Sequence, residues 1–562
     1  MIRKRISSIL ITLLCTLTIG AQQPKGLKKL RAAQVAVLAY TADGTLQQGQ
    51  GTLISEDGIL VTQYDVMKNA TRAVVIDATG NEHPVTEILG ANSAYNLVRM
   101  RMEMGKKKMT YLNITPQQPS EQTQVYIMPS EKADKSVPCT VDTVIHVETF
   151  GTEFKYLTLA HEINGRQANS PVLDQDGLLI GFVQLAIKEG NPSYVIDANY
   201  AASLDIKVMD AGNADLNSIR IPKSLPEDEN DALSFIYLSG KRDTAQYMNY
   251  INRFIDLHPT STAGHTMKAE QQVQMGQYAQ AESTYENAFK QEGVKADELH
   301  YSLSKVIYGL NMSTGYQQYE DWNIERALSE AEKADSISPQ PTYDLQQAHC
   351  LYALKRYEEA GEKFMLLTQT NLRTPELFMY AAQCKQKSQA DNAQVIALMD
   401  SALNCFSKPY PVAAANIILL RAKTLAESEK YREAIAGYND FEHLSGSNVT
   451  ANFYYEREQM EIKCRMYAQA LNDIEKAIKL APDEPVLYAE AAALNYRVGQ
   501  NEQAITLAQQ AITMSDDFAD AHRILGVCLI EKGDKAEARK HLLRAKELGD
   551  KLAESILQKT TE

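Results

Sequence analysis

The chain has 562 residues, of which 44% are hydrophobic and 23% are charged, the balance of a folded protein rather than a disordered one. This length exceeds what one hydrophobic core usually holds, so several units or a repeat array are expected. The net charge of −14 argues against sequence-independent nucleic-acid binding, because that requires a basic surface.

Residues 1–21 have the composition of a secretory signal peptide. Three basic residues, Arg3, Lys4 and Arg5, precede an apolar stretch at 6–19, and Gly20-Ala21 offers a small-residue cleavage site. The apolar stretch is shorter than the roughly 20 residues of a membrane span. Cleavage after Ala21 predicts an exported protein with no membrane span. A retained anchor and a lipid anchor on Cys15 are the alternatives.

The cysteines outside this segment are widely separated, and no CxxC pair occurs among them. Neither a zinc site nor a redox motif is therefore predicted, and no metal or cofactor is expected. Most fall inside apolar helical patterns, which are typical of buried thiols. They are Cys139, Cys350, Cys384, Cys405, Cys464 and Cys528.

Residues 31–205 are rich in strand-forming residues and contain turn dipeptides about every ten residues. The runs 35–40, 51–55, 71–76 and 171–173 each precede such a dipeptide. Short strands separated by turns predict an all-β barrel or sandwich.

The composition of the chain changes after residue 205. Residues 206–230 are predicted to form a polar linker, with Pro222, Pro226 and the acidic run 227–229. From 231 to 562 the pattern is helical and rich in Ala, Leu, Glu, Gln and Lys.

The helical half repeats at a fixed interval, since Ala470, Ala504 and Ala538 lie 34 residues apart. This register resembles that of the tetratricopeptide repeat (TPR), whose period is 34 residues and whose small residues sit where two helices touch. A generic alanine-rich bundle would not explain a register kept over several units. The resemblance implies an all-α TPR superhelix of about eight repeats over 231–562.

A TPR superhelix has a concave face lined by the first helix of each repeat. The resemblance implies that this face binds proteins or extended peptides. In the seventh repeat it places on this face the partner-binding candidates Val486, Ala489, Ala493, Tyr496 and Arg497.

The β-rich half carries a more specific resemblance. Residues 49–62 read Gly-Gln-Gly-Thr-Leu-Ile-Ser-Glu-Asp-Gly-Ile-Leu-Val-Thr, which resembles the start of an HtrA-type, trypsin-like serine protease domain. In that family this stretch leads to the catalytic histidine, and Asp65 stands at the corresponding place here. The resemblance implies an all-β trypsin-like double barrel over 31–205.

Two further landmarks of the family are present with their functional residues replaced. Asn96 stands where the family has the aspartate that orients the histidine. Ala168 stands in place of the nucleophilic serine, and Arg166 in place of a glycine that donates to the oxyanion. The strand-like stretch 176–182, Asp-Gly-Leu-Leu-Ile-Gly-Phe, matches the family and fixes this alignment.

These replacements predict a pseudoprotease. Serine proteolysis needs a hydroxyl nucleophile, an imidazole base and a carboxylate that orients it, and an aspartate is too weak a base for a serine. The alternative is a relocated active site that uses Ser170 with His83, His146 or His161. That alternative requires a two-residue slip, which would break the match from Pro171 to Gly181.

The combination predicts an exported adaptor in which a dead protease-like domain and a TPR solenoid both hold protein partners. A residual serine peptidase and a chaperone-like holdase remain the alternatives. The resemblance to HtrA proteins implies the periplasm or outer envelope of a Gram-negative bacterium, with envelope proteins or extended peptides as partners and no nucleic acid.

Overall fold

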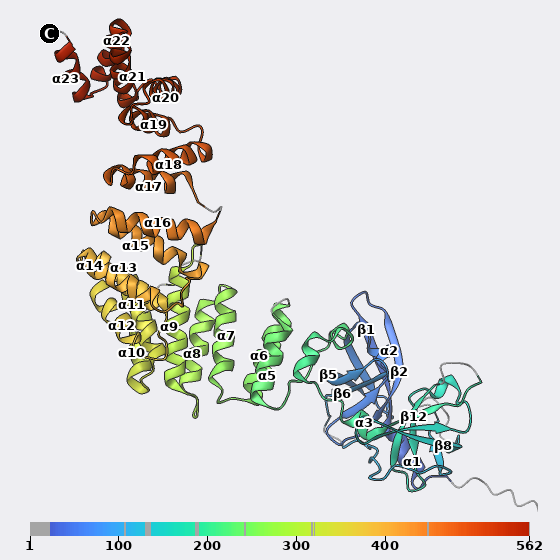
Figure 1. Cartoon of the computed structure of the whole chain (residues 1–562). Helices are drawn as coiled ribbons and strands as arrows, with labels where there is room; N and C mark the ends of the chain where they lie inside the picture. Colours follow the sequence, from blue (N-terminus) through green and yellow to red (C-terminus); the bar gives the residue numbers. More distant parts are fainter. Residues whose placement is uncertain are drawn as a thin grey trace, which may run out of the picture. The chain divides into compact units, whose positions relative to one another are not determined.

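The chain, drawn in Figure 1 with colours that follow the sequence, forms two compact units in the computed structural model, with the boundary between Val294 and Lys295. The predicted signal peptide lies outside the described residues. The described residues are 23–105, 108–129, 136–185, 190–240, 243–315, 319, 321–446 and 449–560.

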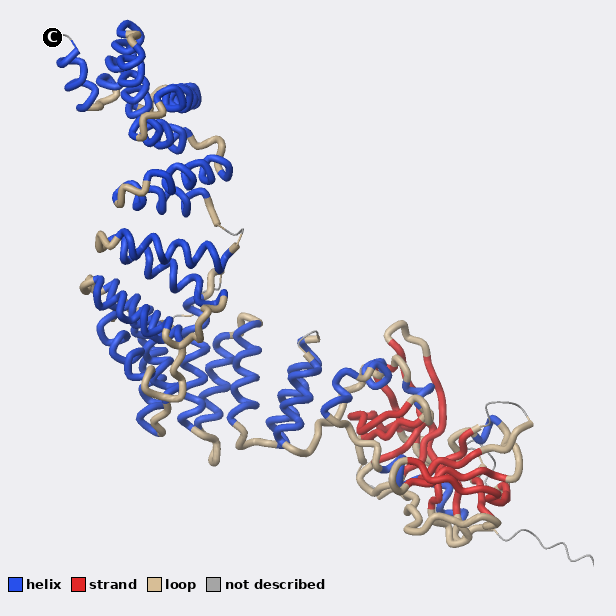
Figure 2. Tube along the Cα trace, viewed as in Figure 1, coloured by secondary structure: helices blue, strands red, loops and turns tan. Residues whose placement is uncertain are grey.

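The first unit contains two closed, six-stranded antiparallel barrels, drawn as red strands in Figure 2. Their strands follow the same order, β1-β2-β3-β6-β5-β4 and β7-β8-β9-β12-β11-β10. The double barrel implied by the resemblance is confirmed. The strands are β1 (Gln34–Thr41), β2 (Leu46–Leu53), β3 (Ile59–Thr62), β4 (Ala70–Ile76), β5 (Glu82–Asn92), β6 (Leu97–Met102), β7 (Gln124–Ile127), β8 (Thr140–Phe150), β9 (Phe154–Leu159), β10 (Pro171–Leu173), β11 (Leu179–Gln184) and β12 (Tyr194–Asp197).

Alternation along the strands builds the core of the first barrel. In β1, Val35, Val37 and Ala39 are buried while the residues between them are partly exposed, the period of two expected for a strand with one buried face. The turn expected at Asp57-Gly58 joins β2 to β3, and Gly58 has a φ of 83°. That left-handed conformation is one that glycine adopts without steric cost.

Short helices connect the strands and follow the barrels. Two of them, α2 and η2, carry residues of the site described below. They are α1 (Leu27–Leu30), η1 (Arg31–Ala33), α2 (Tyr64–Met67), η2 (Gly165–Gln167), α3 (Ala198–Ala202), η3 (Val208–Gly212) and α4 (Ala214–Ser218).

Replacing Gly181 by Ala is expected to destabilise the second barrel by about 1–3 kcal/mol. A Cβ at Gly181 in β11 would overlap the backbone carbonyl oxygen of Ile196 in β12, so the two strands would have to separate. Faster hydrogen exchange of the β11 and β12 amides would report the change. The matched control is Gly105→Ala, whose Cβ would lie 3.8 Å from His83 Cε1, an ordinary contact distance. This variant should leave the hydrogen exchange of the β11 and β12 amides unchanged. Equal effects of both variants would contradict the expectation.

The segment 206–230, predicted as a polar linker, is folded against the first barrel. Ile88 N–H donates to Pro222 O over 2.8 Å, and Ser224 N–H donates to Ile88 O over 2.8 Å. Ile219 and Ile221 are 0% and 1% exposed. Burial alternates along 219–225, where Ile219, Ile221, Lys223 and Leu225 are buried. The sequence does not show this period clearly, because polar Lys223 stands at one of the buried positions.

Four helices follow within the first unit, and α5 and α6 share a buried core with the barrel. Phe235 of α5 and Phe254 of α6 belong to the same apolar cluster as Ile88 of β5. Arg253 of α6 also pairs with the buried carboxylate of Glu87, which accepts from Arg101 Nε over 2.9 Å. These helices are α5 (Glu229–Ser239), α6 (Thr244–Leu257), α7 (Thr262–Gln274) and α8 (Tyr278–Phe289).

In the described part of the second unit every secondary-structure element is a helix (Figure 2). Successive helices contact one another. The helices are α9 (Ala296–Met312), α10 (Ile324–Ile337), α11 (Pro341–Ala353), α12 (Tyr357–Leu367), α13 (Pro375–Lys387), α14 (Asn392–Leu403), η4 (Val412–Ala414), α15 (Ala415–Glu427), α16 (Tyr431–Ser445), α17 (Ala451–Lys463), α18 (Tyr467–Leu480), α19 (Pro485–Arg497), α20 (Asn501–Met514), α21 (Ala519–Lys532), α22 (Lys535–Glu547) and α23 (Lys551–Thr560).

The small residues of the 34-residue register lie where paired helices touch, as the repeat pattern predicts. Ala470, Ala504 and Ala538 are 0%, 0% and 1% exposed. A Cβ on Gly526 of α21 would lie 2.7 Å from Leu542 Cγ of α22. The two helices therefore approach so closely at this point that only a glycine fits without a shift. Among the described residues, no helix has the length and apolarity that crossing a membrane requires.

Candidate functional site

The structure brings together two of the positions that the family alignment assigns to catalysis. Asp65 lies in α2, directly after β3, and Asn96 directly precedes β6, which pairs with β3. Asp65 N–H donates to Asn96 Oδ1 over 2.9 Å, and Tyr64 N–H donates to Asn96 O over 3.2 Å. Asn96 therefore anchors the backbone of α2, while the Asp65 side chain is exposed.

The loop that carries Ala168 forms the 3₁₀ helix η2, and the amides of Arg166 and Ala168 both donate hydrogen bonds within it. Asn164 caps this helix, since its Oδ1 accepts from Arg166 N–H over 2.9 Å. Ala168 N–H donates to Gly165 O over 3.2 Å. In a trypsin-like protease the amides at these two positions point outward and bind the oxyanion. Here both donate within the loop.

Ser170 is fully buried and its hydroxyl oxygen is engaged. Gln50 of β2 donates from its Nε2 to Ser170 Oγ over 2.9 Å and to Ala168 O over 3.0 Å. Ser170 is 0% exposed, and the neighbouring Asn169 is 2% exposed with a φ of 58°. Gln50 thus ties the Ala168 loop of the second barrel to the first.

The three histidines of this half each face a carboxylate. His83 Nε2 lies 3.2 Å from Asp77 Oδ2, and His146 Nδ1 lies 2.9 Å from Glu121 Oε1. His161, whose side chain is 78% exposed, places Nδ1 2.9 Å from Asp142 Oδ1. Thr79, Asn81 and His83 hydrogen-bond to Asp77, and although burial opposes this, they lower the pKa of that carboxyl.

The partner-binding candidates on α19 lie mostly in contacts between helices. Ala489 is 5% exposed and packs with alanines of α20 and α21. Val486, Ala493 and Tyr496 are half-buried in apolar clusters, and Tyr496 OH donates to Glu531 Oε1 over 3.0 Å. Burial and this bond raise the pKa of Tyr496. Arg497 is exposed, with its guanidinium 5.9 Å from the Tyr467 ring. Their role in binding stays a prediction.

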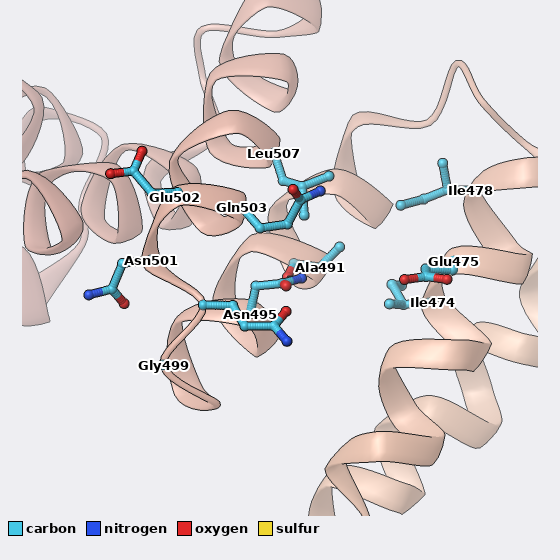
Figure 3. A pocket seen from close by; sticks show the side chains of 11 residues that line it. Ile474, Glu475, Ile478, Ala491, Asn495, Gly499, Asn501, Glu502, Gln503 and Leu507 are labelled. Atoms are coloured by element: carbon cyan, nitrogen blue, oxygen red, sulfur yellow. The ribbon is translucent and has the colours of Figure 1, made fainter.

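A cavity of about 600 Å³ lies beside α19, on residues other than those candidates (Figure 3). Ile474 and Ile478 of α18 line it together with Ala491 and Asn495 of α19 and Leu507 of α20. Ala491 and Asn495 are themselves buried, so the cavity follows the packing side of α19.

Sequence reasoning missed the two residues that fix the Ala168 loop. Asn164-Gly165 is a turn dipeptide, and an asparagine before a short helix is a common cap, so the η2 cap had a local signal. Gln50 had none, because its contacts with Ala168 and Ser170 join residues 118 and 120 positions apart.

Comparisons with known proteins address both halves of the chain. A family model of the trypsin-like peptidase domain matches residues 49–182, and a tetratricopeptide repeat model matches residues 490–553. No curated protein matches the chain.

Solved structures with similarity to parts of the chain include YrrB, MamA and the protease AlgW. YrrB, described as a TPR protein with an unusual peptide-binding site, is 16% identical, with a TM-score of 0.31 over 35% of this chain and 99% of that chain. MamA is 21% identical, with a TM-score of 0.27 over 31% of this chain and 96% of that chain.

The third structure is the HtrA-type protease AlgW with a tripeptide, which is 15% identical with a TM-score of 0.27. The match covers 33% of this chain and 61% of AlgW. The family models and the two-barrel topology together show that the chain carries a trypsin-like peptidase domain followed by tetratricopeptide repeats.

Proposed function

We propose that the protein is an exported binding scaffold, in which the trypsin-like domain holds partners without cleaving them and the repeats provide a second binding surface. The observation that carries this proposal is the Ala168 loop. Ala168 offers no nucleophile, and the amides of Arg166 and Ala168 donate inside the loop rather than toward an oxyanion.

The other positions of the site support the same function. Asp65 is exposed and has no imidazole to act as a base, and Asn96 uses its carboxamide oxygen to hold the α2 backbone. A relocated Ser170 nucleophile would need access to substrate, but Ser170 is buried and hydrogen-bonded to Gln50. In the described part of the chain, no hydrogen bond joins Ser170 Oγ to His83, His146 or His161, whose bonds go to other groups.

The cellular location belongs to this proposal. The basic and apolar composition of residues 1–21 supports export, and the HtrA resemblance supports the periplasm or outer envelope of a Gram-negative bacterium. The partners would then be envelope proteins, recognised as folded surfaces or as extended segments.

The mature chain is expected to show no labelling by a fluorophosphonate probe, because labelling needs an activated serine hydroxyl. An active HtrA-type protease serves as the positive control, and Ser170→Ala as the matched variant of this chain. Labelling of the mature chain that disappears in Ser170→Ala would contradict the proposal and assign a relocated nucleophile.

A further inference from the structure

The positions of the partner-binding candidates on α19 can be compared with positions on α13, because both helices begin with proline. The candidates on α19 follow Pro485 by 1, 4, 8, 11 and 12 residues. The same steps from Pro375 reach Glu376, Met379, Gln383, Gln386 and Lys387 on α13. Proline at the first helical position has its φ preset for a helix, which makes these two starts comparable.

In α13 some of these positions line a cavity, unlike their counterparts in α19. The cavity has a volume of about 420 Å³, within the range of ligand pockets, which is roughly 300–1,000 Å³. Three of the five register positions line it. The lining residues are Pro375, Glu376, Met379, Tyr380, Gln383, Phe406, Ala413 and Ile417.

The apolar wall of the cavity is held in place by aromatic contacts. The Tyr380 ring stacks on Phe364 of α12 with a centroid distance of 4.9 Å and lies 5.2 Å from the His349 ring of α11. Burial lowers the pKa of His349, which favours its neutral form at this wall. A ring fixed on two sides presents a preformed surface to an apolar side chain.

Two polar side chains face the same cavity with unused bonding capacity. Gln383 Oε1 accepts from Tyr352 OH over 3.2 Å, which orients the carboxamide, and within the described part of the chain its NH₂ group makes no hydrogen bond. Glu376 is exposed and forms no ion pair or hydrogen bond with a described residue. The nearby Arg373 is engaged elsewhere, over the Phe378 ring and on Thr368 O.

We propose that this cavity on α13 is the site where the solenoid grips an extended partner segment, through one bulky apolar side chain and an adjacent Lys or Arg. The apolar side chain enters beside Tyr380, the basic group pairs with Glu376, and Gln383 donates to a backbone carbonyl of the segment. This inference rests on the proposed binding function and names its partner chemistry. Glu376 is the charged residue of the lining, which selects a basic partner rather than an acidic one.

The proposal is tested with three fluorescein-labelled Gly/Ser dodecapeptides and the full mature chain, by fluorescence anisotropy. The first peptide carries Lys-Ser-Trp, whose first and third side chains share one face of an extended strand. The second replaces the Lys by Glu, and the third replaces the Trp by Ala. The first should bind at least about tenfold more tightly than either other peptide, and its advantage over the Glu peptide should shrink at high salt.

Two variants assign the binding to this cavity. Glu376→Lys should reverse the preference between the Lys and Glu peptides, and Ala413→Trp, which fills the cavity from an exposed position, should abolish the preference for Trp over Ala. Glu358→Lys makes the same charge change at an exposed position of α12 outside the cavity, and it should alter neither preference.

Equal affinities for the three peptides, or equal effects of Glu376→Lys and Glu358→Lys, would overturn this inference. Those results would leave the scaffold function standing if the mature chain still retained envelope proteins without cleaving them. Cleavage of a substrate would instead overturn the proposed function, whatever the peptides showed.

Discussion

Replacing Arg457 by Met is expected to lower the free energy of unfolding of the α17–α18 repeat by about 3–5 kcal/mol. Arg457 and Asp473 are 3% and 2% exposed, and the guanidinium donates to both carboxylate oxygens over 2.6 and 2.9 Å. Arg457 also pairs with Glu442 over 2.7 Å. Without it, Asp473 would stay buried with Lys476 Nζ 3.7 Å away. Hydrogen exchange of the α17 and α18 amides measures this local stability.

A double variant separates the loss of the pair from the cost of an orphaned charge. Replacing both Arg457 by Met and Asp473 by Leu should recover most of the lost stability, because no buried charge is left unpaired. Arg356→Met removes an exposed arginine that pairs with Glu359 and should have no measurable effect. Equal losses in the single and double variants would contradict this account of the pair.

The same repeat is expected to lose stability as the pH rises from 6 to 9. Glu458 is 0% exposed and Glu461 is 4% exposed, and one carboxyl oxygen of each has no hydrogen-bond partner in the described part of the chain. Burial, reinforced by Glu490, raises the pKa of Glu458 to about 8. Burial, reinforced by Asp473, raises the pKa of Glu461 to about 7.

The direction of this pH dependence follows from the number of protons bound by the folded and unfolded states. Both carboxyls have a higher pKa in the folded state than in the unfolded chain, so the folded state holds more protons between the two values. The stability due to the neutral carboxyls is complete below the unfolded pKa and is lost as the pH rises through about 7 and 8. Over the whole interval from the unfolded pKa of 4.5 to about 8, the loss for Glu458 is on the order of 4–5 kcal/mol, of which on the order of 2–3 kcal/mol falls above pH 6.

Hydrogen exchange of α17 at pH 6, 7.5 and 9, corrected for the intrinsic pH dependence of exchange, measures this loss. Glu458→Gln, which cannot ionise, should flatten most of the pH dependence and stabilise the repeat at pH 9. Glu433→Gln on α16 neutralises an exposed carboxylate and should leave the pH dependence intact. An unchanged pH dependence in Glu458→Gln would show that the buried carboxyl is not its source.

The repeat register could have indicated this region. Glu458 lies 68 residues, two periods, before Gly526, the glycine at which α21 packs on α22. A glutamate at a glycine position, next to an arginine at the position of Leu525, breaks the pattern that the alanines keep. The register alone does not predict that Arg457 pairs with Asp473, because this contact depends on how α17 and α18 pack.

The fold was more predictable than the details of the site. Turn dipeptides and strand-forming runs predicted an all-β barrel or sandwich, and the 34-residue spacing predicted paired helices, because these signals are local and periodic. The double barrel followed from the resemblance to HtrA-type proteases. The structure of segment 206–230 was harder to predict, because it depends on pairing between Lys223 and Ile88, which lies far away in the chain. The replacements that predict an inactive domain, Asp65 and Ala168, could be read from the sequence, whereas the hydrogen bonds of the amides in the Ala168 loop required the structure.

The central claim is that the protein is a scaffold that binds other proteins without cleaving them. The most direct test is to incubate the mature chain with unfolded casein and to measure the mass of the recovered casein by mass spectrometry. An active HtrA-type protease defines the cleaved pattern. The account predicts that casein remains at its intact mass after prolonged incubation, including the fraction that co-purifies with the chain. Casein fragments that appear with the wild-type chain and vanish with Ser170→Ala would contradict it.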